Sequence, residues 1–200
     1  MKKLLASLGL GLFALTSVSP AFAQETIAGT MQECLEGQAD LVTSFQETMK
    51  EIEKSAKTGA RDQRLVDNFR KRLVRMKKVT PEMQKVMDEE AAWDTRLGGT
   101  FEKYFTNWAA MIDGICSTSP ATVKGLWVGF WSAQVQLNTD YLAYLDWLGN
   151  NLVQYRKTVP AAIYRKRLKT LKEKAETEEQ LASAKEFLTE ANALSSTTFE

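Results

Sequence analysis

Apolar residues recur at intervals of three and four along almost the whole chain after residue 26. This spacing places them on one face of an α-helix. No stretch alternates apolar and polar residues as a half-buried strand does. The pattern therefore predicts an all-α protein without a sheet. In the first segment the apolar positions are Ile27, Met31, Cys34, Leu35, Leu41, Val42, Phe45, Met49 and Ile52.

Local signals divide this pattern into helices. Pro81, Pro120 and Pro160 each follow a hydroxyl residue at a distance of one or two positions, which is typical of a first helical turn. Thr177 with Gln180 matches a capping box, in which the two side chains satisfy free backbone amides. These signals predict helix starts near residues 81, 120, 160 and 178.

Glycines predict where the helices end. We expect one helix to stop at Thr58-Gly59 and another at Gly98-Gly99. The chain should then fold as a single-domain bundle of six or seven helices. The predicted ranges are 30–57, 61–78, 81–97, 101–117, 120–157, 160–175 and 178–195.

The first 23 residues have the pattern of a secretory signal peptide. Lys2 and Lys3 precede an uncharged apolar run over residues 4–18, and Ala21 and Ala23 supply the small residues that precede a cleavage site. A membrane anchor is the alternative, but the run is shorter than the roughly 20 residues that span a bilayer. We therefore expect a mature domain over residues 24–200, no transmembrane span after cleavage, and a periplasmic or secreted location.

In an oxidising compartment, cysteines are expected to form disulfides. Cys34 and Cys116 are the only cysteines, so they allow one intramolecular disulfide. Closing a loop of roughly 80 residues would stabilise the fold by about 4.5 kcal/mol in the chain-entropy model. Two buried thiols, or a bond between two chains, are the alternatives. No Cys-x-x-Cys motif indicates a redox function.

The composition excludes much catalytic chemistry. The chain has 200 residues, with 26 Lys and Arg, 25 Asp and Glu, and no His. Without His there is no Ser-His-Asp triad, no His general base and no conventional zinc enzyme site. We therefore predict a non-enzymatic protein that needs no metal or cofactor. Loss of Lys2 and Lys3 with the signal leaves 24 basic and 25 acidic residues, so any electrostatic recognition must be local.

Two short segments are strongly basic. Phe69 opens the first and Tyr164 opens the second, and both continue Arg-Lys-Arg-Leu, which indicates either a duplication or chance. We predict that these helix faces bind an envelope protein or an anionic lipid surface, whereas nucleic acid is not an expected partner. The alternative is that the cations solvate the helices and oppose the dipole at helix ends. The predicted contact residues are Arg70, Lys71, Arg72, Arg75, Arg165, Lys166, Arg167 and Lys169.

Residues 126–155 are apolar around most of a helix and contain only two charged residues, Asp140 and Asp146. Such a helix is expected in the core; the alternatives are an exposed surface that binds a partner or lipid, and a membrane span, which the polar residues in the segment disfavour. If it lines a pocket, the protein carries a lipid or another small apolar ligand. The predicted pocket residues are Trp127, Trp131, Tyr141 and Trp147.

A carboxylate-dependent hydrolase of cell-wall polymers is the third hypothesis. Asp113, Asp140 and Asp146 lie among aromatic residues, where burial raises the pKa of a carboxyl group. Such an enzyme needs two acids roughly 5–10 Å apart in one cleft. The favoured prediction remains a non-enzymatic, exported interaction or adaptor protein that binds an envelope partner through basic helix faces.

Overall fold

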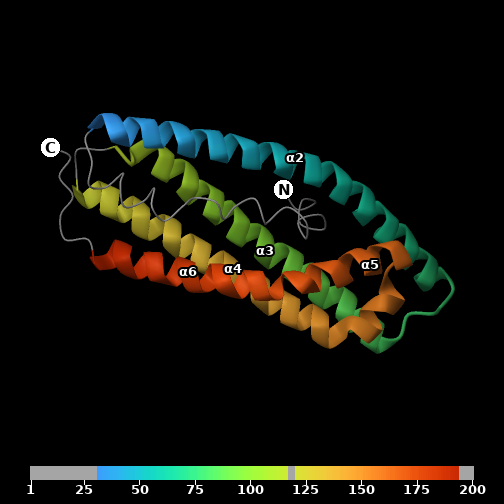
Figure 1. The fold of residues 1–200 in the computed structure, drawn as a ribbon. Coiled ribbons are helices and arrows are strands. Elements are labelled where there is room, and N and C mark those ends of the chain that lie inside the picture. Colours follow the sequence, from blue (N-terminus) through green and yellow to red (C-terminus); the bar gives the residue numbers. More distant parts are fainter. Residues whose placement is uncertain (1–30, 117–119, 194–200) are drawn as a thin grey trace. The chain divides into compact units, whose positions relative to one another are not determined.

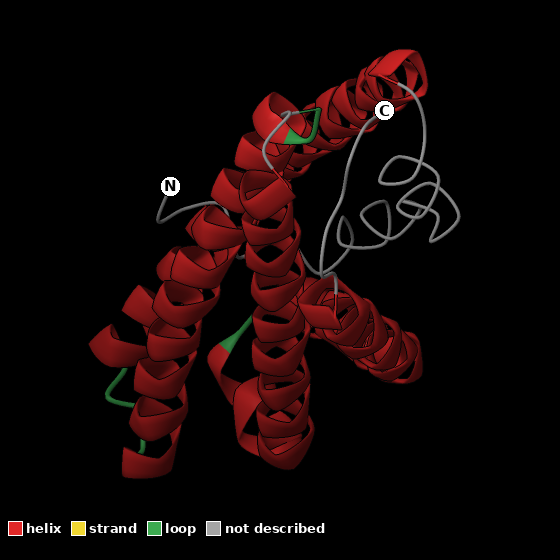
Figure 2. Ribbon diagram, turned by 90° about the vertical axis from the view of Figure 1, so that its left-hand side faces the viewer, coloured by secondary structure: helices red, strands yellow, loops and turns green. Residues whose placement is uncertain are grey.

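The computed structural model describes residues 31–116 and 120–193. In the described ranges the chain forms helices, turns and short connections, with no strand (Figure 2). The predicted all-α class is therefore confirmed. The predicted signal peptide over residues 1–23 lies outside the described part. In chain order, the elements in Figure 1 are α2 (Met31–Arg75), α3 (Pro81–Gly114), α4 (Pro120–Thr158), α5 (Ala161–Thr170), the 3₁₀ turn η3 (Leu171–Glu173) and α6 (Lys174–Ala193).

The described chain has fewer and longer helices than the six or seven predicted. The ranges 30–57 and 61–78 are joined in α2, and the ranges 81–97 and 101–117 are joined in α3. A glycine inside a helix costs only about 1 kcal/mol relative to alanine. Burial outweighs this cost at both places. Gly59 is buried, and Leu97 and Phe101, beside the second expected break, are also buried.

Three of the four predicted helix starts are confirmed and one is wrong. Helices α3 and α4 begin at Pro81 and Pro120, and α5 begins at Ala161, directly after Pro160. The Thr80 hydroxyl caps α3 by accepting a hydrogen bond from the Met83 amide at 3.3 Å. Thr177, in contrast, lies inside α6, where its hydroxyl donates to the Glu173 carbonyl at 2.8 Å. This bond to the preceding turn is typical of a helix interior, so Thr177 is not a cap.

The chain divides into two compact units, and each is described separately. The described part of unit 1 comprises Glu51–Gly99 and Thr139–Glu178. The described part of unit 2 comprises residues 31–50, 100–116, 120–138 and 179–193. The single domain over residues 24–200 stays a prediction. Among the described helices, none combines the length and apolar character that crossing a bilayer requires.

Unit 2 has an aromatic core. The ring centroids of Tyr104 and Trp108, on α3, lie 5.5 and 6.2 Å from that of Phe130, on α4. Trp131 stacks on Trp127 along α4, and the ring centroids of Trp131 and Phe187, on α6, lie 4.6 Å apart.

The predicted Cys34–Cys116 disulfide also concerns this unit and stays a prediction, because the side chain of Cys34 lies outside the described part. No cysteine in that part is a free thiol.

Unit 1 combines an apolar core with buried charges. Val66 and Leu73 of α2 and Met83 and Met87 of α3 are all buried. These positions follow the helical periodicity of the sequence, so tertiary packing explains the apolar pattern here. The polar residues buried in the same unit include Asp62, Thr158, Glu90, Arg167, Thr170, Glu173, Asp140 and Thr177.

Candidate functional site

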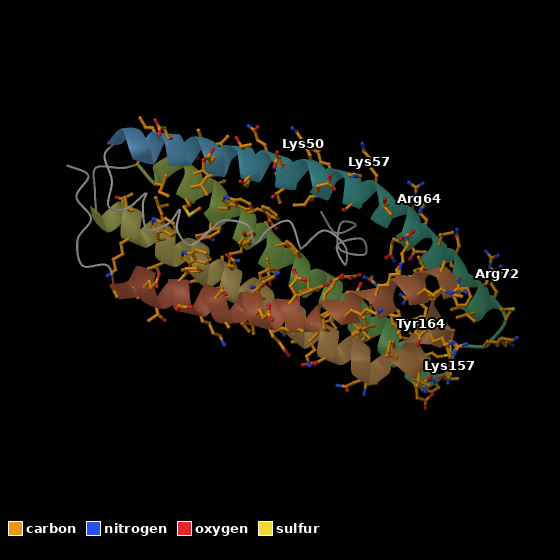
Figure 3. The ribbon with its side chains drawn as sticks, in the orientation of Figure 1. Lys50, Lys57, Arg64, Arg72, Lys157 and Tyr164 are labelled. Carbon is orange, nitrogen blue, oxygen red and sulfur yellow. The ribbon has the colours of Figure 1, made fainter. Side chains whose placement is uncertain are left out.

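An exposed row of cations runs along the part of α2 that belongs to unit 1. At 100° of rotation per residue, its members lie within roughly 60° of one direction, and they extend about 30 Å along the helix. Figure 3 shows Lys57, Arg64 and Arg72 pointing away from the ribbon on one side of α2. We call this set the α2 cationic face. It consists of Lys54, Lys57, Arg61, Arg64, Lys71, Arg72 and Arg75, all of them exposed.

The opposite side of α2 fixes the direction of this face. Val66 and Leu73 are 6% and 9% exposed and pack into unit 1. Asp62, on the buried side, accepts a hydrogen bond from Lys166 of α5, and Arg70 donates to Glu90 of α3. Because these contacts hold one side of the helix against unit 1, the other side is presented to solvent.

Most cations of the α2 cationic face have no acidic partner in the part of the chain that the structure describes. Lys54 lies 3.5 Å from Glu51, and Arg61 lies 3.8 Å from Asp62. Within the described residues, the other five members form no ion pair at 4.0 Å or less. Residues 54–78 hold ten of the 26 Lys and Arg residues and two of the 25 Asp and Glu residues. The local charge is therefore strongly positive although the whole chain is nearly neutral.

The eight contact residues predicted from the sequence fall into two groups. Five are exposed, namely Lys71, Arg72, Arg75, Arg165 and Lys169. Arg70, Lys166 and Arg167 instead pair with carboxylates of unit 1. In these three cases the cation contributes to internal packing, which the sequence pattern did not indicate.

Four members of the α2 cationic face were missed in the sequence. Lys54 and Lys57 were expected on a different helix from Arg61 and Arg64, because a break was predicted at Thr58-Gly59. Once α2 is continuous, spacings of three, four and seven align all four with Arg75. This periodicity is the signal that identifies them.

A cluster of buried charged groups lies in unit 1, and Glu90 is at its centre. Glu90 is 6% exposed and accepts a hydrogen bond from the Tyr155 hydroxyl at 2.7 Å. Its other carboxylate oxygen accepts from Arg70, and Arg167 Nη2 lies 3.9 Å from Oε1. Arg70 Nε also donates to the Thr158 carbonyl at 3.2 Å, and Arg167 Nε donates to the Tyr155 hydroxyl oxygen at 3.3 Å. Thus one buried carboxylate connects α2, α3, α4 and α5.

Two further carboxyl groups of unit 1 take up protons close to neutral pH. Burial, and then the neighbouring Glu90, raises the pKa of Asp94 to about 6. Burial also raises the pKa of Glu173 to about 7, although the Tyr141 hydroxyl donates to Glu173 at 2.5 Å and opposes the rise. Burial raises the pKa of Tyr144 to about 12, and its hydroxyl has no hydrogen-bond partner in the described structure. These groups make the stability of unit 1 sensitive to pH.

The aromatic residues predicted to line a pocket contact protein side chains. Trp127 and Trp131 belong to the aromatic core of unit 2. In unit 1, Tyr141 is bonded to Glu173, and the indole nitrogen of Trp147 donates to Glu89 at 2.7 Å. Trp127, Trp131 and Tyr141 are buried, and Trp147 is partly buried.

The acids considered for hydrolysis are engaged or exposed. Asp140 accepts from Arg96 Nε at 3.0 Å, and Asp146 accepts from Lys174 at 2.7 Å. Asp113, in unit 2, is exposed. Among the described residues, no group of three or more His, Cys, Asp and Glu side chains is placed to hold a metal ion.

Comparisons with known proteins identify no relative of this chain. No family model, curated protein or solved structure matches it. Its function is therefore inferred from the residues described above.

Proposed function

We propose that this protein is a non-enzymatic, exported helical interaction protein that binds an anionic envelope partner through the α2 cationic face. One observation carries the proposal. Seven exposed cations share one side of a helix, and five of them have no acidic partner among the described residues. An anionic partner would supply the missing counter-charge.

The helix dipole explains only part of this face. Arg72 and Arg75 lie in the last turn of α2, where cations oppose the negative end of the dipole. This effect falls off within one turn, whereas Arg64 lies about three turns earlier and Lys54 about six turns earlier. Interaction with the helix dipole therefore does not explain the cations in the N-terminal half of the α2 cationic face.

The cations also act against the stability of the isolated helix. Lys57 and Arg61, like Lys71 and Arg75, are like charges four residues apart, and each such pair costs about 0.2–0.5 kcal/mol. Like charges that lower the stability of a helix must be offset by a favourable interaction elsewhere. Binding of an anionic partner provides that interaction.

The first test is capture of partners from an envelope extract. We expect the mature protein to retain a component that high salt releases, because salt screens exposed charges. The variant Lys57→Gln, Arg64→Gln, Lys71→Gln, Arg72→Gln should lose it. A control that replaces Lys85, Lys103, Lys172 and Lys185 by Gln removes four exposed cations from other elements and should retain it. Equal capture by both variants would contradict the proposal.

Export and the Cys34–Cys116 disulfide are parts of the same proposal. We expect protein isolated from the envelope to begin at Gln24 and to weigh two hydrogen atoms less than the dithiol. Intact-mass spectrometry with and without a reductant measures both features. A retained residue 1–23 segment would contradict export with cleavage, and a mass unchanged by reduction would contradict the disulfide.

One observation favours carriage of a small ligand as a second candidate function. The Tyr104 hydroxyl and the indole nitrogens of Trp108 and Trp127 are buried in unit 2 without a hydrogen-bond partner in the described structure. Unpaired buried donors are uncommon in folded proteins. A ligand with an acceptor group would satisfy them, and the surrounding rings would contact its apolar part.

A further inference from the structure

We infer, on the basis of the proposed function, that the anionic partner is the headgroup layer of a bilayer that contains acidic phospholipids. The inference concerns the α2 cationic face alone, which lies entirely in unit 1. Three features of this face favour a lipid surface over an acidic protein. They are its composition, its linear form and the burial of the opposite side of the helix.

The composition of the face lacks what a protein interface needs. Specific protein interfaces have an apolar centre, with aromatic and arginine side chains seated in pockets and charged residues depleted. The seven cations span about 100° around the helix axis. Within this range Asn68 is uncharged, and Leu65 and Glu53 lie at its two limits. The face thus offers charge without an apolar centre. A layer of phosphate headgroups requires only charge.

The linear form of the face suits a flat partner. The cations follow one continuous helix for about 30 Å along its axis. Lysine and arginine side chains have long flexible stems, so each can reach a separate headgroup without a fixed pocket. Cations on successive turns can therefore each reach a headgroup of one flat surface.

Burial of the opposite side of α2 determines how the helix would bind. Amphipathic membrane helices insert an apolar face into the bilayer. In α2 that side is occupied, because Val66 and Leu73 are packed in unit 1 and Arg70 is bonded to Glu90. The helix would accordingly lie on the headgroups without entering the acyl chains. Attraction is then electrostatic, reversible and sensitive to salt.

The expected strength follows from the number of cations. Each lysine or arginine near an anionic membrane surface strengthens binding about fivefold. Replacing Lys57, Arg64, Lys71 and Arg72 by glutamine should therefore weaken binding by at least about 100-fold. Replacing Lys57 and Lys71 by arginine keeps the charge and should preserve binding within about threefold.

The test uses sedimentation of the mature full-length protein with sucrose-loaded vesicles. One preparation contains phosphatidylcholine alone, and the other contains phosphatidylcholine with phosphatidylglycerol. We expect wild type to sediment only with the second preparation and to be released by salt. The variant with four glutamine substitutions in the α2 cationic face should stay in solution. The control, in which Lys85, Lys103, Lys172 and Lys185 are replaced by Gln, should bind as wild type does. Circular dichroism and thermal unfolding verify that each variant is folded.

Two results would overturn the inference. One is absence of wild-type binding to vesicles that contain phosphatidylglycerol, and the other is equal binding by the four-fold variant and the control. If vesicles fail but the same face still captures an acidic protein from the envelope extract, the lipid inference fails and the proposed function stands. If vesicles and capture both fail, the proposed function fails as well.

Discussion

Replacing Glu90 by glutamine is expected to lower the free energy of unfolding by about 3–5 kcal/mol, the usual cost of breaking a buried ion pair by removing one partner. The substitution keeps the size of the side chain but removes its charge. Arg70 and Arg167 would then remain in unit 1 without the carboxylate that they share. Urea unfolding, followed by circular dichroism, measures the change.

The matched control for this prediction lies on the same helix. Asp88 is exposed, and Asp88→Asn should change the free energy of unfolding by no more than about 0.5 kcal/mol. If Glu90→Gln costs less than about 1 kcal/mol, the buried cluster does not hold the four helices of unit 1 together as described.

The second large effect is a loss of stability as the pH rises from about 4 to 8. Burial raises the pKa of Asp94 from 3.8 to about 6 and that of Glu173 from 4.5 to about 7. Both groups therefore bind their protons more tightly in the folded chain than in the unfolded chain, and protonation favours folding. The stabilisation is complete below the unfolded pKa values and disappears as the pH passes the folded values. One pKa unit corresponds to about 1.4 kcal/mol, and screening by water reduces the total, so we expect a loss of about 2 kcal/mol per group.

Neutral variants isolate these two carboxyl groups. Asp94→Asn and Glu173→Gln should each flatten the dependence of the urea midpoint on pH, and each should stabilise the protein at pH 8 relative to wild type. Asp88→Asn should leave the dependence unchanged. A wild-type midpoint that stays constant or rises between pH 5 and 8 would contradict the assignment.

The buried cluster also bears on the proposed function. Arg70 pairs with Glu90, and Asp62 pairs with Lys166, so contacts on two turns hold α2 against α3 and α5. Such contacts fix the rotation of α2 about its axis. The α2 cationic face is consequently organised before its partner arrives, which reduces the entropy lost on binding.

Local signals in the sequence predict where several helices begin, but not where they continue. Pro81 and Pro120 begin helices as expected, because proline fits a first turn and nowhere else in a helix. Gly59 and the Gly98-Gly99 pair do not end helices, because a glycine preference of about 1 kcal/mol is smaller than the gain from burying the surrounding residues. That gain depends on other helices and is absent from the local sequence.

Only part of the candidate site could be predicted, again because contacts with other helices are absent from the local sequence. The basic segment that includes Lys71, Arg72 and Arg75 is visible in the sequence, and these residues are exposed. Arg70 and Arg167 have the same chemical character but point inward, where both pair with Glu90. Glu90 lies on a different helix, so the sequence around each arginine does not reveal this pairing. Charge alone cannot distinguish a cation that binds a partner from one that satisfies a buried acid.

The most direct test of the central claim is the salt dependence of partner release from the captured protein. For wild type, we expect retention to fall steeply as the salt concentration rises, because several exposed cations act together. The variant at Lys57, Arg64, Lys71 and Arg72 should show weak retention that depends little on salt, while the control at Lys85, Lys103, Lys172 and Lys185 should follow wild type. If the four-fold variant has the same salt dependence as wild type, the α2 cationic face is not the binding surface.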